Sequence, residues 1–342
     1  DFDYEEYTEP KKLHHFIKEQ IIDDEKYYIF FDEIQNVASW EKVVNSLRAT
    51  KNTSIFITGS NSDLLSSDLA THIAGRYVSF RVTPFTFQEV CTLLKNTDKN
   101  DMENVFLDYM KWGGMPQRFM QTDDISRKTY LKDIYDSIII KDIVKRFHIK
   151  DIDLLNRIVT YILTTPSQTF SPESLKKYFE SISRGVSLET LYNYLDYIAR
   201  ANLISKAYRY DIRGKRILTG KYKYYLTDLG FTNILSEDKK EQMGAYLENI
   251  VYNELIARGY AVFIGNTENG EIDFVATKFQ EKVYFQVTYL LSDEAVIERE
   301  FGAFSKIVDN YPKYVLSMDQ FDFSQNGIVH KNIVTWLLEE NL

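Results

Sequence analysis

The sequence predicts a multidomain α/β protein, and three segments support this prediction. Residues 27–61 alternate strand, helix and strand patterns, residues 151–229 combine three helical patterns with two strand patterns, and residues 241–288 place a helix before three strands. A chain of 342 residues with 44% hydrophobic content is long enough to bury two or three cores. The four predicted regions comprise residues 1–85, 86–150, 151–237 and 238–342.

An apolar run in the first region ends abruptly in two carboxylates. Residues 27–31 are aromatic or β-branched, which is typical of a buried strand, and Asp32 and Glu33 follow directly. Open α/β sheets bind ligands at the carboxyl ends of their strands. The arrangement matches Walker B, in which the Asp holds the nucleotide Mg²⁺ through water and the Glu polarises the attacking water. Alternatively, the carboxylates begin an acidic helix N-terminus, where they favour the helix dipole.

A second strand pattern completes a strand–helix–strand unit. Residues 37–48 carry apolar side chains at helical spacing, and residues 54–59 form a second strand pattern that ends in Ser60 and Asn61. These elements predict two parallel strands whose carboxyl ends carry polar side chains.

A third strand pattern, residues 77–82, follows Arg76. Arg76 is a candidate arginine finger or phosphate sensor. The alternative is a loop arginine that ties down the edge of the sheet.

Four short motifs resemble a family of prokaryotic and archaeal AAA-superfamily ATPases. They lie at residues 31–35, 57–61, 75–76 and 84–89, and the similarity extends to residues 311–317. The resemblance implies ATP and Mg²⁺ binding by the N-terminal domain, with Ser60 or Asn61 as the polar sensor of the γ-phosphate. It also implies a winged-helix segment and a restriction-endonuclease-like domain in the C-terminal half.

One motif of this family is absent. No Gly-x-x-x-x-Gly-Lys-Ser/Thr occurs among the 342 residues, and that loop supplies the amides, the Lys and the hydroxyl that hold the phosphates and Mg²⁺. The family places the loop before Asp1, so we expect a truncated P-loop sheet and a fragment of a longer ATPase. We therefore expect ATP and Mg²⁺ to bind tightly to the full-length parent and not to this chain alone.

Residues 86–150 are predicted to be mainly helical. An apolar periodicity over residues 105–110 ends at the helix breaker 112–116, and a helical pattern resumes over residues 130–147. This region resembles the helical lid of AAA-type proteins. The resemblance implies that it passes nucleotide turnover to the C-terminal half.

Residues 151–229 predict three helices followed by a hairpin. Helical patterns begin near Ile152, Pro172 and Glu189, and a strand pair follows. This order predicts a winged helix.

The loop between the two strands carries Arg213, Lys215 and Arg216, which are candidate contacts to DNA phosphates. The third helix begins with residues 187–194, which offer no Arg or Lys to base edges. The net charge of −9 also argues against indiscriminate nucleic-acid binding by the whole chain. The alternative is therefore a rigid connector with a solvated basic loop.

The last region predicts a second candidate site. A helical pattern over residues 241–258 carries Glu248, and the following strands carry Asp273, Gln286 and Thr288. Period-2 alternation places Gln286 and Thr288 on one face of their strand. The arrangement resembles the PD-(D/E)xK nuclease fold, whose carboxylates hold Mg²⁺ and whose Lys assists the attacking water.

The match to that fold is incomplete. Gln286 stands where the motif has Glu and Thr288 where it has Lys, so Glu248 and Asp273 would bind Mg²⁺ weakly. Lys306 is a candidate replacement for the missing Lys. We expect a degenerate nuclease fold used for binding DNA or a protein partner. The alternative is a metal-dependent nuclease or toxin-like effector gated by ATP.

The composition is typical of a cytoplasmic protein. No apolar run approaches the roughly 18 residues of a membrane span, and no signal peptide is visible. The single cysteine, Cys91, excludes an intrachain disulfide and a cysteine zinc cluster. We expect no membrane partner, and the sequence leaves the oligomeric state open.

Overall fold

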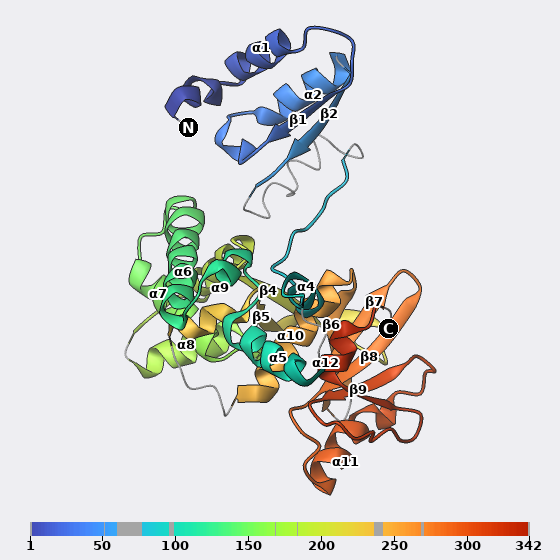
Figure 1. Ribbon diagram of the computed structural model, residues 1–342. Coiled ribbons are helices and arrows are strands. Elements are labelled where there is room, and N and C mark those ends of the chain that lie inside the picture. The colour runs from blue at the N-terminus through green and yellow to red at the C-terminus, as the bar shows by residue number, and fades with distance from the viewer. Residues whose placement is uncertain are drawn as a thin grey trace. The chain divides into compact units, whose positions relative to one another are not determined.

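The chain folds into two compact units in the computed structural model (Figure 1). The first lies within residues 1–81, and the second contains nearly all residues from Val82 to Leu342. The structure describes residues 2–50, 52–59, 77–95, 99–167, 169–182, 184–235, 242–267 and 270–340.

The first unit contains the predicted strand–helix–strand motif. β1 (Tyr27–Phe31) pairs in parallel with β2 (Thr53–Ile57), and α2 (Trp40–Thr50) connects them. Its other helices are η1 (Phe2–Thr8), α1 (Pro10–Gln20) and η2 (Ile34–Asn36). The core consists of Ile17, Ile21, Val43 and Leu47, against which Tyr27, Ile29, Phe31 and Ile55 pack.

β1 packs on this core through one face only. Successive side chains of a strand point to opposite faces, and Tyr28 and Phe30 are 63% and 72% exposed in the described part of the unit. Phe56 of β2 stacks on Phe30, with ring centroids 4.7 Å apart. The prediction of a fully buried strand is therefore wrong for this face.

Residues 77–82, predicted as a third strand, have no regular secondary structure. Val78, Phe80 and Val82 are largely exposed. A strand satisfies its backbone groups only beside another strand, and none of the described strands pairs with this segment. The strand prediction is therefore wrong here.

The second unit begins with the predicted helical region. The helices in chain order are α4 (Phe87–Leu93), α5 (Lys99–Trp112), η4 (Pro116–Met120), α6 (Asp124–Ser137), the π-helical η5 (Ile138–Lys145), α7 (Ile152–Thr164), α8 (Pro172–Ser181), α9 (Leu188–Arg200), η6 (Leu229–Ile234), α10 (Met243–Ala257), α11 (Glu294–Gly302), η8 (Ala303–Lys306) and α12 (Ile333–Leu338). Pro172 is the first residue of α8, as predicted, and Ser171 caps that helix. In Figure 1, α6, α7, α8 and α9 gather on one side of the unit.

One mixed eight-stranded sheet runs through the second unit, in the order β10-β9-β8-β7-β6-β4-β5-β3. The strands are β3 (Thr169–Phe170), β4 (Ile204–Asp211), β5 (Arg216–Leu226), β6 (Ala261–Thr267), β7 (Gly270–Lys278), β8 (Glu281–Val287), β9 (Lys313–Ser317) and β10 (Val329–Asn332). β4 pairs antiparallel with β5 and parallel with β6. The hairpin of the third predicted region is therefore continuous with the sheet of the fourth, across the boundary expected between residues 237 and 238.

Gly113 and Gly114, which follow α5, pack against Asp228 just beyond the end of β5. α5 ends at Trp112, and Gly113 follows with a φ of +74°. The buried carboxylate of Asp228 accepts hydrogen bonds from the backbone N–H groups of Gly114 and Gly230, both at 2.7 Å. A Cβ atom on Gly113 would lie 1.6 Å from Asp228 Oδ1. Only glycine therefore fits where the helices meet the sheet.

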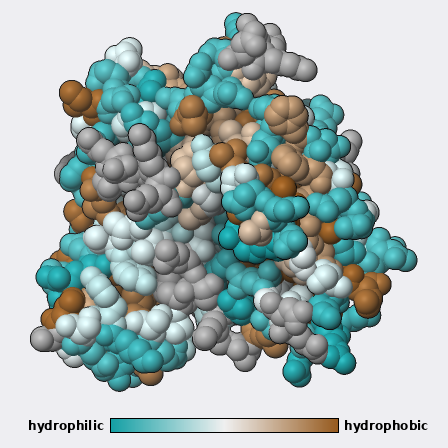
Figure 2. Space-filling view, turned by 90° about the horizontal axis from the view of Figure 1, so that it is seen from below, coloured by the Kyte–Doolittle hydropathy of each residue, from teal (hydrophilic) through white to brown (hydrophobic). Residues whose placement is uncertain are grey.

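The face of the molecule seen in Figure 2 carries hydrophobic residues in small groups separated by hydrophilic ones. Among the described helices, we find none with the length and apolar character needed to cross a bilayer.

Candidate functional site

The acidic pair of the first unit lies where the sequence predicts, at the carboxyl end of β1. Asp32 Oδ1 accepts a hydrogen bond of 2.5 Å from the hydroxyl of Thr58, which directly follows β2. The backbone N–H of Thr58 in turn donates to the carbonyl of Phe31 at 2.8 Å. The parallel pairing thus brings the ends of both strands together. Ser60, Asn61 and Arg76, the other predicted residues of this site, lie outside the described residues.

Glu33 has an unusual backbone conformation for a glutamate. Its φ of 51° lies in the left-handed region, which side-chain-bearing residues seldom adopt, and its carboxylate accepts a hydrogen bond from Gln35 Nε2. Backbone strain of this kind clusters at ligand sites. Asp32 is exposed to solvent, so its carboxylate is accessible to a hydrated Mg²⁺.

In the second unit, three carboxylates surround one buried ammonium. Lys223 Nζ lies 2.9 Å from Glu248 Oε1, 2.6 Å from Glu271 Oε1 and 4.0 Å from Asp273 Oδ1. The Lys223 side chain is only 8% exposed. We call these four residues the Lys223 cluster.

Three elements of the fold bring this cluster together. Lys223 lies on β5, Glu248 on α10, and Glu271 and Asp273 on β7. Glu271 and Asp273 are two residues apart and share one face of their strand. A second residue of β5, Tyr225, donates its hydroxyl to Glu248 Oε1 at 2.6 Å.

The neighbouring strand β8 contributes to the same place through the predicted residue Gln286. Gln286 Oε1 accepts a hydrogen bond from the backbone N–H of Asp273 at 3.2 Å, and Asp273 Oδ2 accepts one from Val287 N–H at 2.8 Å. Glu248, Asp273 and Gln286 are therefore brought together. Thr288 is buried, and its backbone N–H donates to the carbonyl of Leu316 on β9.

Burial and crowding of charge perturb the Lys223 cluster. Burial and the nearby Glu248 charge raise the pKa of Asp273 well above its ordinary value, and burial also raises the pKa of Glu248. Burial alone would lower the pKa of Lys223, but the three carboxylates together raise it. The ammonium thus stays protonated and is unsuited to act as a general base.

Lys223 and Glu271 were not among the predicted site residues. Lys223 is the last residue of a stretch rich in Lys and Arg, residues 200–223, yet it is an internal ion-pair partner. Arg209 from the same stretch also turns inward, with Nη2 2.6 Å from Glu271 Oε2. The lysine beside the carboxylates is Lys223, whereas the predicted candidate, Lys306, is exposed at the end of η8. Glu271 lies two residues before Asp273 on the same strand, so the sequence could have indicated that the two side chains share one face. The sequence gives no comparable indication for Lys223.

The three basic residues predicted to contact DNA lie together at the turn between β4 and β5. Arg213, Lys215 and Arg216 are all exposed. The turn is held by Asp211, whose carboxylate accepts from Gly214 N–H at 2.9 Å. The exposed residues of α9 are Glu189, Tyr192, Asn193 and Asp196. The turn is therefore basic while the exposed face of this helix is not.

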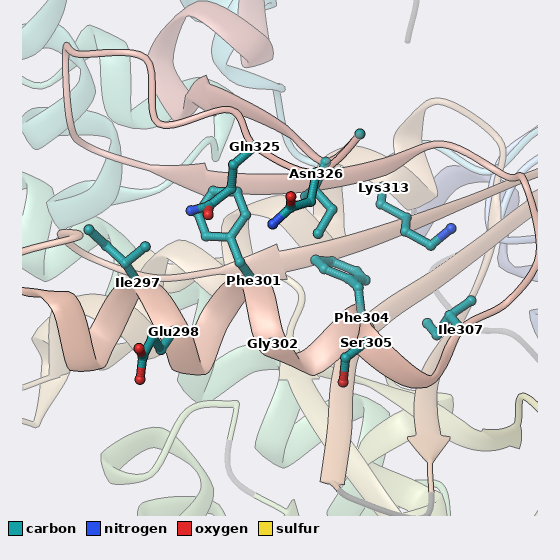
Figure 3. Close-up of a pocket in the computed structure, with 12 residues that line it drawn as sticks. Ile297, Glu298, Phe301, Gly302, Phe304, Ser305, Ile307, Lys313, Gln325 and Asn326 are labelled. Atoms are coloured by element: carbon teal, nitrogen blue, oxygen red, sulfur yellow. The ribbon is translucent and has the colours of Figure 1, made fainter.

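A cavity of about 450 Å³ lies between α11, η8 and the segment before β10. Figure 3 shows Phe301 and Phe304 pointing from the helix towards Gln325 and Asn326, whereas Glu298 points away. None of the predicted site residues lines this cavity.

Comparisons with known proteins give two family matches and two relatives. A family model described as an AAA domain matches residues 1–91, and a model described as a domain of unknown function (DUF8612) matches residues 103–242. An uncharacterized protein of Haemophilus influenzae is 35% identical over 99% of this chain, which covers 84% of that relative. The chain belongs to the family of this protein.

A second relative is the uncharacterized protein MJ1544 of Methanocaldococcus jannaschii. It is 30% identical over 82% of this chain, and the match covers 65% of the relative. The match to residues 1–91 relates this part of the chain to AAA domains, as the sequence motifs indicate.

Proposed function

We propose that this chain supplies the acidic half of an AAA-type nucleotide site, in an ATP-dependent protein whose second unit binds DNA or a protein partner. The observation that carries the first part is the parallel β1–β2 pair, with Asp32 and Glu33 at its carboxyl end beside Thr58. The match of an AAA domain to residues 1–91 supports the same conclusion.

The residues of this site fit a Mg²⁺–nucleotide complex only in part. Asp32 is exposed and would hold hydrated Mg²⁺, and Glu33 would orient and polarise a water for attack on the γ-phosphate. The bound metal would neutralise the developing phosphate charge. The backbone amides and Lys of a phosphate loop do not occur in these 342 residues, so a complete site needs a loop from outside them.

Calorimetric titration with ATP and Mg²⁺ tests this proposal. We expect the chain alone to bind ATP weakly, because the phosphate loop supplies most phosphate contacts in this fold. A longer form of the protein that carries such a loop should bind ATP, and Glu33→Gln should abolish hydrolysis while it retains binding. A low-micromolar dissociation constant for the chain alone would contradict the proposal.

For the second unit, we favour a winged helix whose turn contacts nucleic-acid phosphates. Support comes from the element order α7-β3-α8-α9-β4-β5 and from the exposed basic turn. The exposed face of α9 carries Glu189 and Asp196, which disfavour its insertion in the major groove. Binding to DNA through Arg213, Lys215 and Arg216 would therefore depend little on the base sequence of the DNA.

Fluorescence anisotropy with a labelled DNA duplex tests the role of the turn. Changing Arg213, Lys215 and Arg216 to Glu should abolish binding, and binding to the unmodified protein should weaken steeply with salt. The matched control changes three exposed lysines elsewhere to Glu, so that net charge falls equally: Lys141, Lys177 and Lys306. Equal losses in both triple variants, or binding that is flat in salt, would contradict a specific role for the turn and favour a protein partner.

A metal-dependent nuclease or toxin-like effector is the second candidate function. The convergence of Glu248, Asp273 and Gln286 favours it. Against it, the Lys223 ammonium lies beside Glu248 and Asp273. In addition, the described part of the chain holds no group of three Asp, Glu, His or Cys side chains suited to a metal. Mg²⁺- or Mn²⁺-dependent DNA cleavage that is lost in Asp273→Ala would establish this function.

A further inference from the structure

The Lys223 cluster has the composition of a metal site but a different centre. Metal centres in proteins gather carboxylates from separate elements around one cation. In this cluster α10 and β7 supply three carboxylates, and the cation at their centre is the ammonium of Lys223 on β5.

The surroundings of Lys223 match what a buried cation requires. Glu248 and Glu271 accept from its ammonium at 2.9 and 2.6 Å, which are charge-assisted hydrogen-bond distances. The same two carboxylates have further donors, since Tyr225 donates to Glu248 and Arg209 to Glu271. Glu248 Oε1 and both carboxylate oxygens of Glu271 therefore already accept hydrogen bonds.

A divalent ion would have to displace this arrangement. Mg²⁺ requires oxygen ligands at 2.0–2.1 Å in octahedral geometry, whereas these carboxylates are spaced for an ammonium and for hydrogen bonds of 2.6 to 2.9 Å. The neighbouring Gln286 offers little more, since it is neutral and its Oε1 accepts a hydrogen bond from Asp273 N–H.

We propose that the Lys223 ammonium takes the place of a divalent cation in this cluster, so that the protein holds the carboxylates together with its own side chain. The cluster then acts as an internal clasp. It fixes β5 to α10 and β7 without a metal. This inference does not depend on nucleotide or DNA binding, and it contradicts the nuclease alternative.

If Lys223 takes the place of a divalent cation, the unmodified protein should bind Mn²⁺ poorly and Lys223→Met should bind it well. Methionine keeps a similar length but removes the charge, which leaves three partly buried carboxylates without their central cation. We expect Mn²⁺ to bind Lys223→Met at least about tenfold more tightly than the unmodified protein and to raise its melting temperature. Lys206→Met is the matched control, because Lys206 on β4 lies over the ring of Tyr222 and not among carboxylates.

Calorimetry and thermal unfolding with Mn²⁺ as the probe decide between the outcomes. No saturable binding below millimolar Mn²⁺ by the unmodified protein and by Lys206→Met, with clear binding by Lys223→Met, supports the clasp. If Lys223→Met folds only when Mn²⁺ is present, that rescue also supports it. The inference is overturned if the unmodified protein binds Mn²⁺ tightly and Asp273→Asn abolishes the binding. It is equally overturned if Lys223→Met, folded or unfolded, gains nothing from Mn²⁺.

Discussion

Replacing Gly113 by alanine tests how firmly the helical region is attached to the sheet. Gly113 follows α5, and its Cα faces the buried carboxylate of Asp228 at the end of β5. An added methyl group would lie 1.6 Å from Asp228 Oδ1 and 2.4 Å from its Cγ. Because real carbon atoms do not approach so closely, the carboxylate or the α5 terminus must move.

Two costs determine the size of the effect. A left-handed φ of +74° costs an alanine roughly 1–2 kcal/mol. Displacing the carboxylate also breaks at least one of its hydrogen bonds, from Gly114 or Gly230, and hydrogen bonds to charged groups contribute roughly 1.5–3 kcal/mol each. We therefore expect Gly113→Ala to lower the free energy of unfolding by about 2.5–5 kcal/mol.

Gly327→Ala separates the two costs. Gly327 has nearly the same φ, +76°, but no atom lies within 4 Å of its added Cβ. Gly327→Ala should therefore carry only the cost of the left-handed backbone, which lowers the free energy of unfolding by roughly 1–2 kcal/mol. Urea unfolding followed by circular dichroism measures both variants. Equal losses in Gly113→Ala and Gly327→Ala would mean that the contact with Asp228 does not stabilise the junction.

Three further outcomes are expected. In the anisotropy assay, the triple Glu variant at Arg213, Lys215 and Arg216 should lose DNA binding, while the matched triple retains most of it. ATP titration should give weak binding to the chain alone, and Glu33→Gln in a form with a phosphate loop should abolish hydrolysis, measured as phosphate release. His330 is buried beside Ser317, and burial lowers its pKa. The stabilisation by neutral His330 is therefore fully present above the ordinary pKa of about 6.5 and is lost as the pH falls below it. The free energy of unfolding of His330→Gln, measured with urea, should therefore change less between neutral and mildly acidic pH than that of the unmodified protein.

Local patterns in the sequence predict the elements well where one face is consistently apolar. The helix expected near Ile152 is α7 (Ile152–Thr164), with six buried apolar residues at helical spacing. The glycine pair after Trp112 ends α5, as its composition indicates. The same reasoning fails for residues 77–82, because a strand depends on a partner that its own sequence does not specify.

The Lys223 cluster could not be predicted from spacing alone. Lys223 is 25 residues from Glu248 and lies in a stretch rich in exposed basic residues. Its burial follows from the pairing of β4 with β6, which brings the hairpin into the C-terminal sheet. Sequence reasoning placed a domain boundary between these elements, and it therefore gave neither Lys223 nor Glu271 a role in the site.

β5 connects the features that the sequence assigns to separate regions. Its first residue, Arg216, belongs to the basic turn, Lys223 holds the carboxylates, and Asp228 just beyond its end anchors the helices that follow the first unit. A strand does not change length appreciably, and here it is fixed at both of these anchors. A shift of Lys223 relative to α10 would have to break the ion pairs of a buried lysine, which is strongly unfavourable. The part of β5 between Lys223 and Asp228 should therefore keep its position relative to α10 and β7, whereas the register shift of β4 between Ala207 and Arg209 leaves the turn outside this fixed segment.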